Sequence, residues 1–164
     1  MLEKVLFAKN LGSLLDRVSR ITWIAKYLSR QLNINPLTHD LLLQAAKLSK
    51  NDLVSQMVGE FPELQGVMGA KYILAEGQSK DIALALIEQY LPRFSGDNLP
   101  ESELGSLLAL SDRFELILSI FSKGERPTGS SDPYALRRAG NGILLLIWAN
   151  QWSLNIHELF KVGI

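Results

Sequence analysis

The sequence has no cysteine and only two histidines, His39 and His157, among its 164 residues. The lack of cysteine excludes disulfide bonds, zinc–thiolate centres and thiol nucleophiles. Two imidazoles are also too few for an active site built from three or four histidines. A chain of this length can bury an apolar core of its own, so its stability requires neither a disulfide nor a metal ion.

The sequence also lacks an excess of either charge and any long apolar run. It has 17 basic and 17 acidic residues, which excludes a strongly basic arm for nucleic acids but allows a local basic face. Its longest apolar run covers residues 143–149, far short of the roughly 20 residues that cross a membrane. No apolar stretch typical of a signal peptide follows the first residues. We therefore expect a cytoplasmic protein with no membrane partner.

The sequence is rich in leucine, which recurs at helical spacing. Apolar residues recur every three or four positions, and valine, isoleucine and threonine never alternate with polar residues as in a half-buried strand. Ser13, Ser79 and Ser153 have side chains suited to N-caps, and Thr38 begins the second periodic segment. Trp148 lies in an apolar run and is expected in the core. The pattern predicts an all-α fold of about eight helices, at 14–32, 38–48, 52–58, 62–73, 80–91, 100–121, 132–148 and 154–162.

The longest expected loops, 94–99 and 123–131, both lie between helices of one core. No low-complexity segment or internal repeat divides the chain, so residues 1–164 are expected to form a single helical domain. The last residues, 161–164, follow directly on a predicted helix. This ending indicates a domain excised from a longer protein.

Several long segments carry a family resemblance. They are KNDLVSQMVGEFPELQGVMG at 50–69 and PTGSSDPYALRR at 127–138, supported by 9–13, 90–97, 99–100 and 107–113. Together these segments resemble the β subunit of the bacterial two-subunit glycyl-tRNA synthetases. The resemblance extends from Glu3 to Ala149. It points to the internal helical region of that subunit, which is similar to HD-domain phosphohydrolases.

The resemblance implies a fold and a role. The fold would be a degenerate HD domain, and the protein would act as part of an ATP-dependent glycine–tRNA ligase. In this family the α subunit forms glycyl-adenylate from ATP and glycine, so the present chain would need no cofactor and would not be catalytic alone. Its partners would be glycine tRNA, the α subunit and the remaining domains of the β subunit.

The comparison with HD hydrolases can be tested on the residues. Such enzymes hold metal ions through several histidines and aspartates. Here the pair His39–Asp40 falls at a helix start, and Lys50 is a cation where a ligand would be needed. Asp52 and Asp112 are the candidate relics of a ligand set. We therefore expect no metal and no catalytic residue. The alternative is a divergent metal-dependent phosphohydrolase.

Six basic residues are candidates for tRNA contact: Arg17, Arg20, Lys50, Lys71, Arg137 and Arg138. Arg17 and Arg20 share one helix face through their three-residue spacing. The turn before Arg137 and Arg138 leads into a helix N-terminus, which can bind a phosphate. Asp132 could cap that same terminus and repel a phosphate, which favours a structural role instead. A third interpretation is a packing module that never touches RNA, and the sequence does not decide between these.

Overall fold

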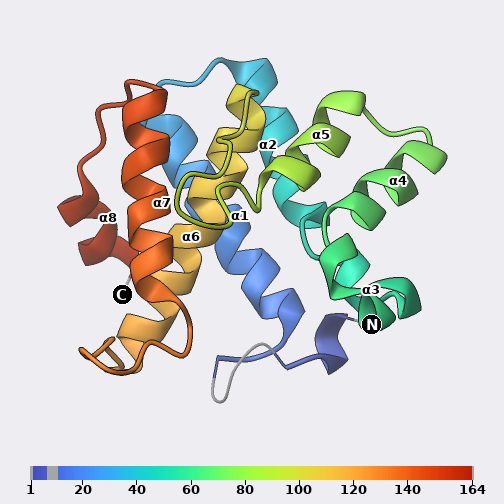
Figure 1. The fold of residues 1–164 in the computed structure, drawn as a ribbon. Coiled ribbons are helices and arrows are strands. Elements are labelled where there is room, and N and C mark those ends of the chain that lie inside the picture. Colours follow the sequence, from blue (N-terminus) through green and yellow to red (C-terminus); the bar gives the residue numbers. More distant parts are fainter. Residues whose placement is uncertain (1, 7–10, 164) are drawn as a thin grey trace.

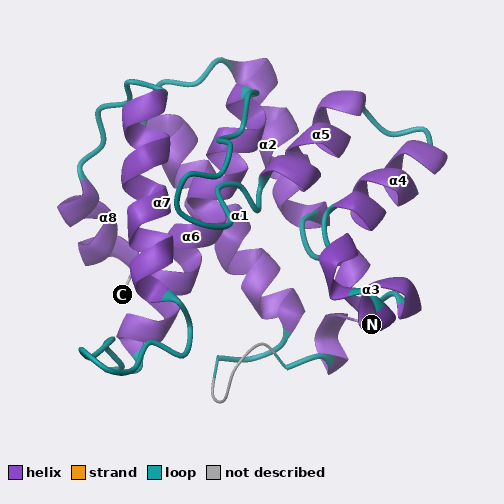
Figure 2. Ribbon diagram, viewed as in Figure 1, coloured by secondary structure: helices purple, strands orange, loops and turns teal. Residues whose placement is uncertain are grey.

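The computed structural model describes residues 2–6 and 11–163, and that part of the chain is helical without any strand (Figures 1 and 2). The predicted all-α fold is confirmed. Its α-helices are α1 (Leu14–Gln31), α2 (Pro36–Leu48), α3 (Gln56–Glu60), α4 (Val67–Ala75), α5 (Lys80–Glu88), α6 (Glu103–Ser122), α7 (Leu136–Ala149) and α8 (Ile156–Gly163). Three short 3-10 helices, η1 (Leu2–Lys4), η2 (Asn51–Val54) and η3 (Pro62–Leu64), complete it.

Side-chain caps set where most of these helices begin. Ser13 and Asp16 form the reciprocal capping box of α1, with Asp16 N donating to Ser13 Oγ and Ser13 N donating to Asp16 Oδ2. Ser79 caps α5 through the Asp81 N–H. The predicted caps Ser13 and Ser79 are thus confirmed. Asn155, whose Oδ1 accepts from Glu158 N, replaces the predicted cap Ser153 at the start of α8.

Three predicted helices are interrupted or shifted by local backbone chemistry. The second begins at Pro36 rather than Thr38, because Asn35 Oδ1 accepts from the Thr38 N–H and Pro36 fits the first helical position. The segment predicted at 62–73 breaks into η3 and α4 at Gly66, whose φ of 79° belongs to the left-handed region. Similarly, η2 and α3 divide the predicted helix 52–58 at Ser55, which caps α3.

Two hydrophobic cores share α1 and α6. The first core lies between these helices and α2, α4 and α5, with Ile21, Leu42, Ile82 and Leu107 among its buried residues. The second core joins α1 and α6 to α7 and α8 through residues that include Phe114. Figure 1 shows α6 between α7 on one side and α1 on the other. Because α6 contributes to both cores, almost its whole circumference is buried.

The position of Trp148 differs from the prediction. Helix α7 buries the stripe Leu136, Ala139, Ile143 and Leu146, which follows the three-to-four-residue spacing of one face. Trp148 falls on another face and is 72% exposed. The apolar run 143–149 therefore extends around more of the helix than the core buries. Among the described residues, no helix combines the length and apolarity that a membrane span requires.

Candidate functional site

A cluster of buried and partly buried charges joins α1 to α6. Arg17 on α1 donates from Nη2 to Asp112 Oδ1 at 3.0 Å and from Nε to Glu115 Oε2 at 2.9 Å. Arg20, one turn further along, donates from Nε to Glu115 Oε1 at 2.9 Å. The two arginines share one helix face, as their spacing predicts, and the spacing of Asp112 and Glu115 presents both carboxylates to that face. We call these residues, together with Lys50, the α1–α6 charge cluster.

Lys50 reaches this cluster from the turn after α2. Its side chain is only 2% exposed, and its Nζ lies 3.1 Å from both Asp112 Oδ1 and Gln89 Oε1. The ammonium group also sits 4.8 Å from the centre of the Tyr90 ring. Burial lowers the pKa of Lys50, and the attraction of Asp112 offsets only part of that effect. With its donors directed inward, the ammonium of Lys50 has almost no surface to offer a ligand.

Asp112 is the anion that binds two of the three cations of the cluster, Arg17 and Lys50. Burial alone would raise the pKa of Asp112, but the nearby charges of Lys50 and Arg17 outweigh it and hold the pKa below its ordinary value. For Arg17 the balance is similar, because the attraction of Asp112 and Glu115 exceeds the cost of burial and raises its pKa. Asp112 and Arg17 therefore stay ionised at neutral pH, and each is bound to an opposite charge within the protein.

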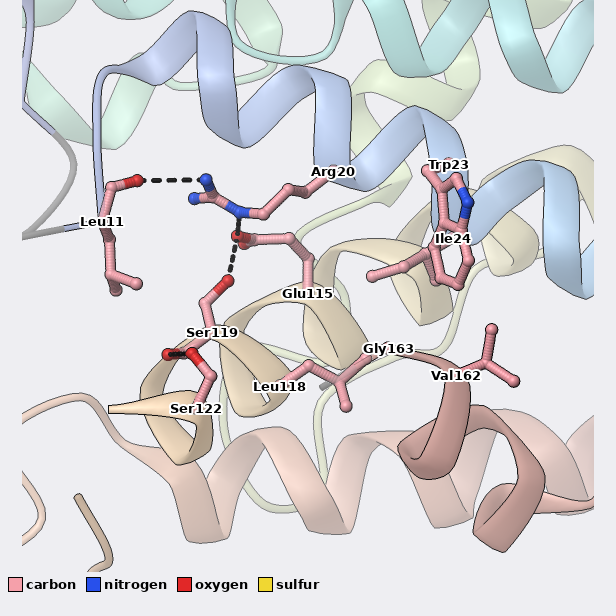
Figure 3. Close-up of a pocket in the computed structure, with 10 residues that line it drawn as sticks. All are labelled: Leu11, Arg20, Trp23, Ile24, Glu115, Leu118, Ser119, Ser122, Val162 and Gly163. Atoms are coloured by element: carbon pink, nitrogen blue, oxygen red, sulfur yellow. Dashed lines mark hydrogen bonds and ion pairs between the residues drawn. The ribbon is translucent and has the colours of Figure 1, made fainter. Parts of the chain in front are cut away.

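The outer edge of the cluster lines a pocket of about 370 Å³ (Figure 3). There Arg20 Nη1 donates to the Leu11 carbonyl at 3.0 Å, and Ser119 Oγ donates to Glu115 Oε1 at 2.7 Å. The remaining walls are largely apolar and include Trp23, Ile24, Leu118 and Val162. Arg20 keeps about a third of its side chain exposed here, with its charge already paired to Glu115.

The two candidate relic ligands have structural partners. Asp52 Oδ2 accepts from the backbone N–H of Gly66 at 2.7 Å and of Gly69 at 3.1 Å, so it closes the start of α4. Asp112 belongs to the charge cluster, and His39 Nδ1 lies 2.6 Å from Ser29 Oγ. Within the described ranges, no group of three or more histidines, aspartates or glutamates is arranged to hold a metal ion.

The start of α7 is occupied by Asp132. Its Oδ1 accepts from Leu136 N at 2.8 Å and its Oδ2 accepts from Arg137 N at 3.0 Å, so its carboxylate occupies N–H groups of the first turn, although the N-cap residue is Ala135. These bonds, first that from Arg137 N, lower the pKa of Asp132. The helix begins at Leu136 rather than at Pro133, because Ala135 adopts a left-handed φ of 54°. A phosphate would meet a carboxylate at this terminus.

The six candidate tRNA contacts thus divide into two groups. Arg17, Arg20 and Lys50 are bound to carboxylates within the protein. Lys71 on α4 and Arg137 and Arg138 in the first turn of α7 are exposed. Arg137 donates to the Thr128 carbonyl, which orders the turn before α7. The three side chains of the second group are the most open to an external anion, whereas Arg20 keeps about a third of its side chain exposed.

Comparison with known proteins matches the sequence of this chain to one family. The family model described as "Glycyl-tRNA synthetase beta subunit" covers residues 1–164. The chain belongs to the glycyl-tRNA synthetase beta subunit family. Among its relatives, the glycine–tRNA ligase beta subunits of Acaryochloris marina and Trichodesmium erythraeum are both 48% identical, over 96% and 98% of the chain. That of Halothermothrix orenii is 44% identical over 99% of the chain.

The resemblance to the β subunit of glycyl-tRNA synthetases is thereby confirmed, and the chain corresponds to a part of that subunit. It spans 22% to 24% of the length of those three relatives. Three of the motifs that carry the resemblance supply internal contacts: 50–69 contains Lys50 and Asp52, 107–113 contains Asp112, and 127–138 contains Asp132. Of the motif at 9–13, residues 9 and 10 lie outside the described residues.

Glu115 and Gln89 contribute to the charge cluster, although the sequence pattern does not predict either of them there. Glu115 is fully buried and binds Arg17 and Arg20 of α1, while Gln89 accepts from Lys50 and donates to the Ser49 carbonyl. The sequence does hold a signal for Glu115, because a carboxylate inside the apolar stretch of α6 requires a partner. Gln89 carries no such signal, since a polar residue at a helix end is ordinarily exposed.

Proposed function

We propose that this chain is a non-catalytic helical domain of a glycyl-tRNA synthetase beta subunit, contributing to the binding of glycine tRNA and to the architecture of the enzyme. In that proposal the complete enzyme is a cytoplasmic, ATP-dependent glycine–tRNA ligase. The α subunit uses ATP and glycine, and the rest of the beta subunit completes the assembly around this domain.

Family membership over the whole chain is the observation that carries the proposal. The charge cluster supports the non-catalytic part, because its carboxylates and cations neutralise one another in a buried setting. Exposed Arg137 and Arg138 at the start of α7, with Lys71 on α4, support contact with the tRNA backbone. Such contacts bind phosphates without reading bases and weaken steeply as salt rises.

The test is binding of labelled glycine tRNA to the chain by fluorescence anisotropy over a series of salt concentrations. We expect binding that weakens with salt, and replacement of Arg137 or Arg138 by glutamine should reduce the slope of log K against log salt by about 1 each. Arg30→Gln, an exposed arginine on α1, is the matched control and should leave the slope unchanged. A folded chain that fails to bind at low salt would refute the tRNA-binding part.

A packing module that bridges other domains is the second candidate. The exposed apolar side chains of α7 favour it, with Leu144 46%, Leu145 40% and Trp148 72% exposed. In this case tRNA would not bind the chain alone, and a domain or subunit of the enzyme would cover α7. Protection of the backbone amides of α7 on addition of the complete partner subunit, measured by hydrogen exchange, would support this candidate.

A further inference from the structure

A groove runs along the exposed face of α7. Its opposite wall is the loop between α5 and α6, whose residues Phe94 and Ser95 face Arg137, Arg138 and Trp148 across a volume of about 730 Å³. Figure 1 shows this yellow-green loop beside α7. We call it the α7 groove. Its volume lies within the roughly 300–1,000 Å³ of ordinary ligand sites.

Aromatic and aliphatic side chains form one part of the α7 groove. Phe94 is 59% exposed and Trp148 72% exposed, and Leu144 and Leu145 lie on the helix between the arginines and Trp148. Neither ring takes part in an aromatic pair among the described residues. Two large rings without a stacking partner therefore border the same groove.

The other end of the α7 groove is cationic. No acidic residue occurs between Asp132 and Glu158, so α7 carries two arginines and no carboxylate. Asp132, the acidic residue of the lining, already binds two backbone N–H groups. Within the described part of the chain, the guanidinium of Arg138 has neither a hydrogen bond nor an ion pair. In a protein with no net charge, this places positive charge beside exposed aromatic rings.

From this juxtaposition we propose that the α7 groove binds an unpaired stretch of RNA, with bases stacked on Trp148 and Phe94 and phosphates at Arg137 and Arg138. The inference deepens the proposed tRNA-binding function and rests on it. Every base offers a flat π face, and arginines suit phosphates, so this pairing of rings and cations is the chemistry of single-strand recognition. A duplex keeps its bases stacked inside and could use only the arginines.

The test compares three RNAs with the chain by fluorescence anisotropy: a short unpaired strand of adenines and cytosines, that strand annealed to its complement, and glycine tRNA. The unpaired strand should bind more tightly than the duplex. Trp148→Leu, which keeps an apolar side chain but removes the ring, should weaken binding of the unpaired strand about 5-fold to 150-fold, equivalent to about 1–3 kcal/mol per stacked base. Trp148→Phe should restore most of the affinity.

The matched control is Trp23→Leu, because Trp23 is 43% exposed and borders the pocket of Figure 3, which shares no lining residue with the α7 groove. The Trp23→Leu variant should not change the affinity.

If glycine tRNA binds but Trp148→Leu has no effect on any RNA, the groove proposal fails while the proposed function stands, and the apolar face is a packing surface. Equal losses of affinity in Trp148→Leu and Trp148→Phe would also contradict base stacking in the groove. So would equal affinity for the unpaired strand and the duplex. Absence of all RNA binding would overturn both proposals.

Discussion

Lys50 and Asp112 show how single residues of this protein depend on partners far along the chain. Removing a buried charge from water costs several kcal/mol, which only a close partner of opposite charge can offset. For Lys50 that partner is Asp112, and Asp112 is in turn held by Arg17. Removing the shared anion leaves the buried Lys50 without its ion pair and leaves Arg17 with Glu115, whereas removing Lys50 leaves Asp112 its pair with Arg17.

We therefore predict that Asp112→Asn lowers the free energy of unfolding by about 3–5 kcal/mol, in the range found when a buried pair loses one member. Lys50→Met, of similar length and apolar, should cost clearly less because the Arg17–Asp112 pair survives. Urea unfolding at neutral pH measures both. Equal costs for the two variants would contradict the shared-anion account.

The same residue predicts a pH dependence. The pKa of Asp112 in the folded protein is below its ordinary value of 3.8, so its ionised form contributes stability that is present above about pH 4. As the pH falls below 3.8 and through the folded pKa, this contribution is lost. The difference in unfolding free energy between the wild type and Asp112→Asn should thus shrink below about pH 4. A difference that stays constant down to about pH 2 would contradict it.

Residue spacing explains why the sequence places Arg17 and Arg20 on one face but does not predict the carboxylate that binds them. The common face of Arg17 and Arg20 follows from one helix and can be seen directly in the sequence. Their partner Glu115 lies 98 and 95 positions away, on a helix whose rotation against α1 is fixed by packing. From the sequence, Arg17 and Arg20 are therefore candidates for tRNA contact. Only the fold shows that both are bound to a carboxylate within the protein.

At the scale of elements, α6 approaches α5 closely at Gly105. Ser102 caps α6, and the buried Glu88 of α5 accepts from the backbone N–H of Glu101 and from the Ser102 hydroxyl. A methyl group on Gly105 would contact the Glu88 carboxylate and lie 2.7 Å from its Cβ. The absence of a side chain there is what allows the two helices and the carboxylate to share the space.

Gly105→Ala should therefore destabilise the protein by about 1–3 kcal/mol through overpacking. Gly140→Ala in α7 is the matched control, because a methyl group there would meet no neighbouring side chain or element within 4 Å and alanine favours a helix interior by roughly 0.5–1 kcal/mol. Thermal unfolding followed by circular dichroism should move the two midpoints in opposite directions. A stabilised Gly105→Ala protein would show that α5 and α6 can separate without cost.

Helix boundaries are predictable where the signal is local and are missed where it is not. Ser13 and Ser79 cap the helices that follow them, and each cap involves only residues that are close in the sequence. By contrast, α4 begins where Asp52, from fourteen residues earlier, accepts from Gly66 N. The exposure of Trp148 has a similar origin, because periodicity gives the apolar width of α7 but not how much of it the neighbouring helices cover.

At the scale of the whole molecule, the sharing of α1 and α6 predicts that the two cores unfold together. Leu107 belongs to the first core and Leu118 to the second, while Trp152 packs against both. Leu107→Ala and Leu118→Ala should each cost about 2–5 kcal/mol. In each variant, urea transitions followed by circular dichroism and by tryptophan fluorescence should coincide, as a two-state transition requires.

The control for this prediction is Leu84→Ala, since Leu84 on α5 is 45% exposed and its loss should change stability by no more than about 0.5 kcal/mol. Separated transitions in Leu107→Ala, with the fluorescence midpoint left near that of the wild type, would mean that the second core survives loss of the first. Coincidence is expected because each core lacks two of its helices once α1 and α6 unfold. A cavity in either core therefore destabilises α6, which contributes residues to both cores.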